Sequence, residues 1–391
     1  MPTLAFVLDF IPNGCRASDD FLLAHAAALR ARGWSAVYVF SGAPTSASFS
    51  ASLGDLGVPW LVAPSKPSVS QAIAIGCKLR NYQPDILQTQ FMSKFHPNIP
   101  ALKIASGARY WIASDHSSGA VRQKSLPGRI LSRMRGFITG IYVDRVITVS
   151  DFVRRRDVYE LSLPENKMRL VYNGIDVDRF SCDRTKVHPT PTVAFAGQLI
   201  PEKGLMTLLR AMKRLVNEGL SIVLRIAGTG PQETALREYC KDQRLNGMVE
   251  FLGQINWIPD LFSQADVVVV PSEWEEAFGY VVAEAMASGA YVIGSDAGGI
   301  SEVIGEGGAT GLIFRKGDPV DLANKIRYVL SCEEQHRSAI RKAARERVEQ
   351  LFSIDRMAYG YIDIYDELVP TRGNGSKVSL KPRNTALSGP E

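Results

Sequence analysis

The chain has 391 residues, which is too long for one ordinary hydrophobic core and predicts two domains. Hydrophobic residues make up 46% of it, with 33 glycines and 21 prolines, a composition that is typical of globular proteins and excludes a fibrous or wholly disordered chain. The net charge of +5 is uneven: residues 1–172 carry 20 Lys and Arg against 11 Asp and Glu, which indicates an anionic partner or, alternatively, a merely solvated basic face.

Apolar runs alternate with helical stretches along the first half of the chain. The predicted strands are residues 4–10, 35–40, 59–64, 85–90, 109–114, 144–150 and 168–174. The first run contains Asp9 and has neither a basic leader nor a cleavage site, so it is predicted to be a buried strand and not a signal peptide. Short buried strands separated by helices predict a parallel sheet with helices on both faces.

Residues 120–142 are rich in basic residues and contain no acid. The basic residues are Arg122, Lys124, Arg129, Arg133 and Arg135, and the apolar residues between them include Ile130, Leu131, Met134, Phe137 and Ile138. This pattern predicts a basic amphipathic helix that lies on an anionic membrane surface, to which residues 154–156 add three arginines. The alternative is a solvated helix that packs on its own domain.

The alternation of strands and helices restarts after a polar segment at residues 181–191. The further predicted strands are residues 192–199, 221–228, 248–255, 265–272, 291–296 and 310–314. The predicted organisation is an N-terminal domain at 1–180, a second domain at 190–350, a helix at 351–370 that returns to the first domain, and a disordered tail at 372–391. Ligands of such sheets lie beyond the carboxyl ends of the strands, so two facing domains would enclose a cleft.

Glycine-rich turns at strand ends in the second half are candidate phosphate-binding sites. Gly197 ends one strand, and Lys203 stands beside the start of the next helix, where backbone N–H groups and the helix dipole favour an anion. Gly228 and Gly230 form a similar turn, and Gly298–Gly299 precede another helix. A solvated lysine and ordinary turns are the alternatives. The dinucleotide fingerprint G-x-G-x-x-G after a first strand is absent, which argues against an NAD-dependent dehydrogenase.

Glu276 and Glu284 lie eight residues apart at a predicted strand–loop–helix junction. Glu276 precedes the helix, where an acid is favourable by about 0.3 to 1 kcal/mol without any function. Glu284 lies inside the apolar run VVAEAMA, where an uncompensated carboxylate would cost several kcal/mol. We therefore expect Glu284 to have polar partners, such as the hydroxyls of a bound ribose.

The second half resembles the donor domain of glycosyltransferase family 4 in the order and spacing of its motifs. The resemblance covers nearly all of residues 192–315, through GQLIPEKG, GTGP, FLGQI, ADVVVVPSEWEEAFGYVVAEAMASG and SDAGGISEVI. It implies an α/β protein of GT-B fold, with two Rossmann-like doubly wound domains facing a central cleft. It also implies a retaining enzyme that moves a sugar from a nucleotide diphosphate sugar to a hydroxyl acceptor, without a metal or other cofactor.

The resemblance also implies roles for individual residues. His116 would lie near the reacting sugar, Glu276 would contact the sugar hydroxyls, and Lys203 would neutralise the diphosphate, so these three are the catalytic candidates. The donor-binding candidates are Gly14, Arg16, Gly197, Gln198, Lys203, Gly228, Gly230, Phe278, Gly279, Glu284, Gly298 and Gly299. Two places depart from the family's pattern. Gln198 stands where a basic residue is common, and residues 13–16 replace a glycine-rich loop, where Arg16 would supply the missing cation.

Several alternatives remain at this stage. Asp176-x-Asp178 spells the metal-binding DxD of other sugar transferases, but its context predicts a turn. A sugar-nucleotide epimerase or phosphorylase of the same fold, and a non-catalytic sugar-nucleotide sensor, are alternative functions. The expected acceptor is a glycan or a lipid-linked acceptor in surface polysaccharide or glycolipid synthesis, and no nucleic-acid-binding motif is present. Five scattered cysteines and no apolar run of about 18 residues predict a cytoplasmic chain, peripheral on the inner face of the membrane through 120–142.

Overall fold

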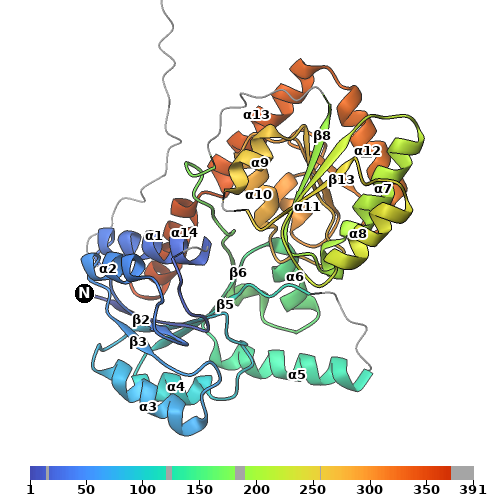
Figure 1. The fold of residues 1–391 in the computed structure, drawn as a ribbon. Helices are drawn as coiled ribbons and strands as arrows, with labels where there is room; N and C mark the ends of the chain where they lie inside the picture. The colour runs from blue at the N-terminus through green and yellow to red at the C-terminus, as the bar shows by residue number, and fades with distance from the viewer. Residues whose placement is uncertain (15–16, 120–125, 181–189, 256, 371–391) are drawn as a thin grey trace, which may run out of the picture.

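Two parallel β-sheets, each covered by helices on both faces, organise the protein (Figure 1). The computed structural model describes residues 1–14, 17–119, 126–180, 190–255 and 257–370. Arg16, the first residues of the 120–142 segment and the 372–391 tail lie outside the described residues. The strand order of both sheets is that of a Rossmann fold, so the predicted class of two doubly wound α/β domains is confirmed.

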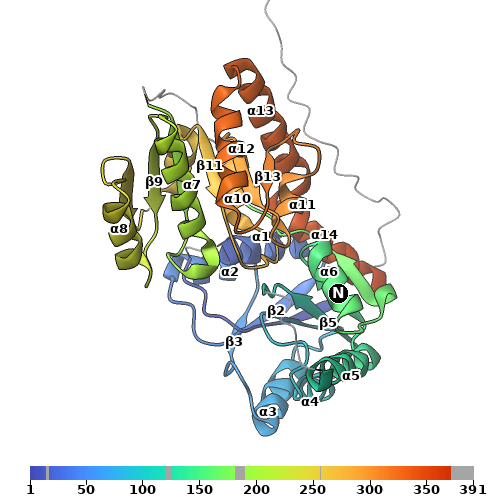
Figure 2. The same cartoon turned by 90° about the vertical axis from the view of Figure 1, so that its right-hand side faces the viewer.

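The first domain has seven strands in the order β3-β2-β1-β4-β5-β6-β7. The strands are β1 (Thr3–Leu8), β2 (Ser35–Phe40), β3 (Trp60–Val62), β4 (Ile86–Gln90), β5 (Tyr110–Asp115), β6 (Arg145–Thr148) and β7 (Met168–Leu170). One face packs on α1 (Ala17–Ala31), α2 (Ala47–Asp55) and α14 (Ile354–Leu368). On the other side lie α3 (Val69–Arg80), α4 (Ile99–Ser106) and α5 (Leu126–Tyr142) (Figures 1 and 2). The helix α6 (Asp151–Tyr159) and a short 3-10 turn (Glu165–Lys167) link β6 to β7.

The second domain has six strands in the order β10-β9-β8-β11-β12-β13. The strands are β8 (Thr192–Ala196), β9 (Val223–Ala227), β10 (Val249–Gly253), β11 (Val267–Val270), β12 (Val292–Ser295) and β13 (Leu312–Phe314). One face packs on α7 (Leu205–Asn217), α8 (Glu233–Asp242) and α12 (Pro319–Ser331). The other packs on α9 (Ile258–Gln264), α10 (Tyr280–Ala287), α11 (Ile300–Ile304) and α13 (Glu334–Leu351), and a 3-10 turn (Pro201–Lys203) precedes α7.

Strand β1 illustrates why the runs form sheets that are buried on both faces. Its even-numbered residues Leu4, Phe6 and Leu8 pack towards α1 and α14, whereas Ala5 and Val7 pack in the core on the opposite face. All five are nearly inaccessible to solvent. Apolar residues are therefore needed at every position, which explains the continuous apolar run of the sequence.

Helix α14 follows the second domain in the sequence but packs on the first, against α1 (Figures 1 and 2). The two segments that cross between the domains lie side by side, since the Ile175 N–H donates to the Phe352 carbonyl and the Ile354 N–H to the Ile175 carbonyl, both at 2.9 Å. In the buried interface, His25 on α1 and the hydroxyl of Tyr365 are hydrogen-bonded at 2.9 Å. Burial lowers the pKa of His25 to about 3, so this contact is made by a neutral imidazole.

Helix α5 docks on its own domain through small residues. A Cβ at Gly136 would lie 1.5 Å from the Leu161 carbonyl oxygen, and one at Gly140 would lie 2.7 Å from Pro164, so only glycine permits this close approach. The larger apolar residues of the helix remain exposed: Leu126, Ile130, Leu131, Met134, Phe137, Ile138, Ile141 and Tyr142. No helix in the described part of the chain has both the length and the apolar character needed to cross a bilayer.

Candidate functional site

A cavity of about 420 Å³ lies between the two domains, at the carboxyl ends of their strands. Its lining includes Ser18, Phe91, His116, Ser118 and Asn173 from the first domain and Gly197, Lys203, Ser272, Glu276, Phe278 and Gly279 from the second. All three residues predicted as catalytic therefore face one space, although they are far apart in the sequence. Lys203 is the only lysine or arginine on this lining within the residues that the structure describes.

Lys203 and Glu276 form an ion pair across the second-domain side of the cavity. The Lys203 Nζ lies 2.6 Å from Glu276 Oε1, and the Ser272 hydroxyl donates to the same oxygen at 2.8 Å. Lys203 ends the 3-10 turn before α7, and Glu276 lies in the loop between β11 and α10. The pair therefore holds a cation at the cavity wall beside the starts of two helices, where a phosphate is favoured.

His116 follows the end of β5 and faces the same cavity from the first domain. Its Nε2 is hydrogen-bonded to the hydroxyl of Tyr361 on α14 at 3.3 Å, and its ring packs on Phe91 with 4.9 Å between centroids. Burial lowers the pKa of His116 to about 4, against a smaller opposing effect of Asp115. At neutral pH the group is therefore an uncharged imidazole that can hydrogen-bond a substrate hydroxyl.

The loop that carries His116 is bonded to the loop that carries Glu276. The Gly119 N–H donates to the Glu275 carbonyl, and the Ala277 N–H donates to the Ser118 hydroxyl, both at 2.9 Å. These bonds flank Glu276 on either side in the sequence. The two domains thus meet directly at the cavity, which limits the access of water to it.

Glu284, on α10, does not line this cavity and has no hydrogen bond or ion pair to its carboxylate within the described part of the chain. Burial raises its pKa to about 7, with Arg179 opposing that shift. A carboxylate at this position is therefore costly, as its apolar neighbours in the sequence predict. Within the described residues its charged form has no hydrogen bond or ion pair that would offset the loss of hydration, and only the more distant charge of Arg179 favours it.

Replacing Glu284 with Gln is expected to stabilise the ligand-free protein at pH 8 by about 1–2 kcal/mol and to weaken nucleotide binding. The pKa of Glu284 is higher in the folded protein than in the unfolded chain, so folding favours its protonated form. Its contribution to stability is therefore complete below the pKa of the unfolded chain and is lost as the pH rises through about 7. The gain should therefore vanish near pH 5, where the native group is protonated. Urea unfolding of both proteins at pH 5 and pH 8 measures it, and a gain that is equal at the two pH values would contradict this account.

Four of the glycines predicted to bind the donor already use their N–H groups within the protein. The donors and acceptors, with their distances, are Gly14 to Asp19 (2.9 Å), Gly197 to Ala227 (3.0 Å), Gly228 to Gly253 (2.7 Å) and Gly299 to Glu276 (2.8 Å). Those N–H groups shape the loops around the cavity. Of the other donor-binding candidates, Gln198, Gly230 and Gly298 do not line the cavity, whereas Phe278 and Gly279 do.

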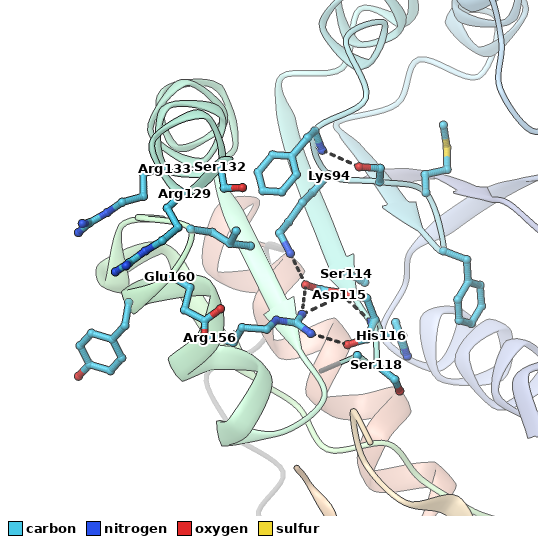
Figure 3. Close-up of a pocket in the computed structure, with 18 residues that line it drawn as sticks. Lys94, Ser114, Asp115, His116, Ser118, Arg129, Ser132, Arg133, Arg156 and Glu160 are labelled. Carbon is cyan, nitrogen blue, oxygen red and sulfur yellow. Dashed lines mark hydrogen bonds and ion pairs between the residues drawn. The ribbon is translucent and has the colours of Figure 1, made fainter. Parts of the chain in front are cut away.

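A second, larger cavity of about 1030 Å³ lies in the first domain and shares Phe91, His116 and Ser118 with the first (Figure 3). At its floor Lys94 and Arg156 both bond to the buried Asp115, the residue before His116. Although burial acts to raise it, Lys94 and Arg156 hold the pKa of Asp115 well below its ordinary value.

Asp157 on α6 is the second acid of this charge cluster. It is fully buried and lies 2.9 Å from the Lys94 Nζ. Burial raises the pKa of Asp157 to about 7. Lys94 and Arg156 each lie within ion-pair distance of both acids, and the four side chains tie β5 and α6 together behind His116.

Phe91 and Asn173 are among the residues that line the inter-domain cavity and were not predicted. Phe91 follows β4 in the left-handed region with φ of 60°, a conformation that costs about 1–3 kcal/mol, and the residue is 41% exposed. Asn173 is buried, and its Oδ1 has no hydrogen-bond partner within the described residues. An unpaired buried acceptor at a cavity wall is suited to a hydroxyl donor from a ligand. The sequence carried no signal for Phe91, whereas Asn173 lay near the end of the predicted strand at residues 168–174 and was not singled out.

Asp176, the first residue of the DxD sequence, accepts the N–H groups of Asp178 and Arg179 at 3.2 and 3.3 Å. This is the geometry of an Asx turn, as its context predicted. Arg179 also forms an ion pair with Asp20 on α1. Within the described residues no group of three or more His, Cys, Asp or Glu is arranged to hold a metal ion.

Comparison with known proteins relates both halves of the chain to sugar transferases. The family described as "Glycosyl transferases group 1" matches residues 178–347, and "Glycosyltransferase Family 4" matches residues 21–179. An uncharacterized glycosyltransferase of Methanocaldococcus jannaschii is 31% identical over 56% of this chain and 59% of its own length. A GDP-mannose-dependent monoacylated alpha-(1-6)-phosphatidylinositol monomannoside mannosyltransferase of Corynebacterium glutamicum is 30% identical over 64% of this chain and 68% of its own.

Solved structures agree with this relation at the level of the fold. The Anabaena protein HepE, solved in complex with UDP, superposes with a TM-score of 0.77 at 20% identity, over 94% of this chain and 100% of that one. The predicted arrangement of two facing Rossmann-like domains is thus confirmed. The archaeal relative is matched over less than two thirds of its own length.

Proposed function

Because the chain belongs to glycosyltransferase family 4, we propose that it transfers a sugar from a nucleotide diphosphate sugar to a hydroxyl acceptor. The observation that carries this proposal is the inter-domain cavity in which the Lys203–Glu276 pair faces His116. The position of Lys203 suits a leaving diphosphate, and that of Glu276 suits the sugar hydroxyls. The neutral imidazole of His116 and the Asn173 Oδ1, which has no hydrogen-bond partner among the described residues, supply hydrogen-bonding groups on the opposite wall.

We further propose that transfer proceeds with retention, by departure and attack on the same face of the sugar. Among the described residues that line the cavity Glu276 is the only carboxylate, and it is already bonded to Lys203 and Ser272, which makes it a poor nucleophile. The bond from the anomeric carbon to the diphosphate breaks, the acceptor oxygen bonds to that carbon, and a diphosphate oxygen takes the hydroxyl proton. Lys203 stabilises the charge that develops on the diphosphate, so no metal ion is required in this proposal.

The proposed acceptor is a glycan or a lipid-linked molecule reached at an anionic membrane surface. Helix α5 supports this, since its large apolar residues face solvent while Gly136 and Gly140 make its contacts with the domain. Its three described arginines lie along the borders of that apolar face, as in helices that lie in the membrane interface. The name of the corynebacterial relative includes a phosphatidylinositol mannoside, which is consistent with such an acceptor.

The test of the proposed reaction is a panel of nucleotide sugars, read first by thermal shift and then by product formation. A donor at about 100 times its dissociation constant stabilises the folded protein by roughly 2.7 kcal/mol. The donor that stabilises the protein should then be consumed faster with an acceptor present, and EDTA should leave the rate unchanged. Stabilisation without any transfer or hydrolysis would favour the sensor, and epimer formation without an acceptor would favour the epimerase.

Replacing Phe137 and Ile141 with Gln is expected to weaken binding to vesicles of phosphatidylcholine and phosphatidylglycerol by about tenfold or more. Both residues are more than half exposed on α5, so their loss removes apolar contact with the bilayer without disturbing the core. Ile104→Gln is the matched control, because Ile104 is 78% exposed but lies on α4 and not on α5. Equal sedimentation of the double variant and the control with the vesicles would refute the role of α5.

A further inference from the structure

We propose that the larger cavity binds a phosphate or other anionic group of the acceptor, and that Arg129 and Arg133 on α5 are the residues that hold it. This inference rests on the proposed function, because it assigns the acceptor's place beside the donor cleft. The cavity is about 1030 Å³, so it can hold a sugar together with a phosphate. The positive charges on its lining, and not only its volume, indicate that the ligand is anionic.

The larger cavity adjoins the donor cleft. Phe91, His116 and Ser118 line both spaces, so a molecule held in the larger one presents its near end to His116. The strained backbone of Phe91 keeps an exposed aromatic ring at this junction. An acceptor hydroxyl placed there is adjacent to the sugar that the other cavity would hold.

The charges on the wall of the larger cavity do not cancel. Its described lining contains four cations, Lys94, Arg129, Arg133 and Arg156, against the carboxylates of Asp115 and Glu160. The charges of Lys94 and Arg156 are matched at the floor by Asp115 and the buried Asp157. No carboxylate lies within ion-pair distance of the other two arginines in the described part of the chain. Two guanidinium groups are thus left without an acidic partner.

The geometry of α5 brings these two arginines together. Residues four apart in a helix lie on one face with about 5–6 Å between their Cβ atoms, and Figure 3 shows both side chains leaving α5 in the same direction. Arg133 is oriented by its Nε, which donates to the Ser162 hydroxyl at 3.0 Å, while its terminal nitrogens make no hydrogen bond to any described residue. Two planar guanidinium groups side by side match the oxygens of a phosphate better than point charges do.

The position of the arginines also connects the cavity to the exposed apolar face of α5. They occupy one border of that face, on the side of the cavity, whereas Arg135 lies on the opposite border and does not line the cavity. An anionic group at Arg129 and Arg133 would therefore sit where a membrane-bound acceptor carries its headgroup. A soluble anionic acceptor would bind the same two arginines. A lipid headgroup and a soluble phosphate are therefore recognised in the same way at this position.

The test uses the full chain and inorganic phosphate as the probe, with binding measured by calorimetry. Replacing Arg129 and Arg133 together with Gln is expected to weaken phosphate binding by about tenfold or more, whereas Arg135→Gln should not change it. Lys203→Met is measured in parallel, because phosphate could instead occupy the donor cleft. Phosphate binding that is lost only in Lys203→Met, or that is absent from the wild-type protein, would overturn the inference.

Thermal shift with the nucleotide-sugar panel separates this inference from the proposed function. The arginine variant should keep the wild-type response to the donor, so a lost phosphate site with an intact donor response supports the inference. A chain that binds phosphate through the two arginines but responds to no nucleotide sugar would refute the proposed reaction alone. Vesicles containing phosphatidic acid distinguish a lipid acceptor from a soluble one. If vesicle binding depends on the two arginines, the anion belongs to a lipid. If the two arginines bind only free phosphate, the anion belongs to a soluble acceptor.

Discussion

Replacing Lys203 with Met is expected to lower kcat by about 100- to 1000-fold while the protein remains folded. The lysine is the only described cation on the lining of the donor cleft, so its loss leaves the diphosphate without a full counter-charge as the sugar bond breaks. The loss also leaves Glu276 unpaired, and its negative charge then repels the diphosphate. Initial rates at saturating donor measure the effect.

The control for this prediction is Lys316→Met, which removes a neighbouring ion pair with Glu275 outside the cavity. The Lys203→Arg variant keeps the charge and should recover a large part of the rate. Glu276→Ala should spare the binding of free nucleotide and weaken that of the nucleotide sugar, whereas Glu284→Ala should weaken both. A Lys203→Met protein with the kcat of the Lys316→Met control would remove the lysine from the reaction.

Replacing Lys94 with Met is expected to destabilise the protein by about 3–5 kcal/mol, because it leaves Asp157 buried without its nearest cation. Burial raises the pKa of Asp157 to about 7, so the acid is neutral at pH 5.5 and the loss should be smaller there than at pH 8. Guanidinium unfolding at the two pH values measures both effects.

Lys103→Met is the matched control for the buried lysine. Its partner Asp144 lies 3.2 Å away and both side chains are partly exposed, so removal of the pair should cost less than about 1 kcal/mol. The double change Lys94→Met with Asp157→Asn should restore part of the lost stability, since it removes the unpaired charge. A Lys94→Met protein that is no less stable than Lys103→Met would show that the cluster does not support β5.

The fold followed from the sequence because the central strands, such as β1 and β4, are buried on both faces. In β1 the residues alternate between two cores, and both cores demand apolar side chains, so the run is continuous and easily recognised. Helix α10 was placed correctly for the same reason, with Glu276 before it and Glu284 in its fifth position. These are local patterns that no distant contact overrides.

The candidate site was only partly predictable, because much of it depends on contacts between distant segments. Lys94 meets acids that are 21 and 63 residues further along the chain, and nothing in its own neighbourhood signals a buried ion pair. The glycine turns were assigned to phosphate from their spacing, yet Gly197 and Gly228 donate their N–H groups to adjacent strand ends. A sequence shows that a loop is glycine-rich but not which of its N–H groups remain free.

Helix α14 imposes an order on the folding of the chain during synthesis. Its Tyr361 and Tyr365 fill the core of the first domain, where Tyr365 contacts His25 and Tyr361 supports His116. The part of the first sheet's face that α14 covers beside α1 and α2 therefore stays exposed until about residue 365 has left the ribosome, although domains ordinarily fold as soon as their own residues emerge. The second domain, which lies between, can fold first. A chain that stops before α14 would contain every residue of the donor side of the cleft and still lack a finished acceptor side.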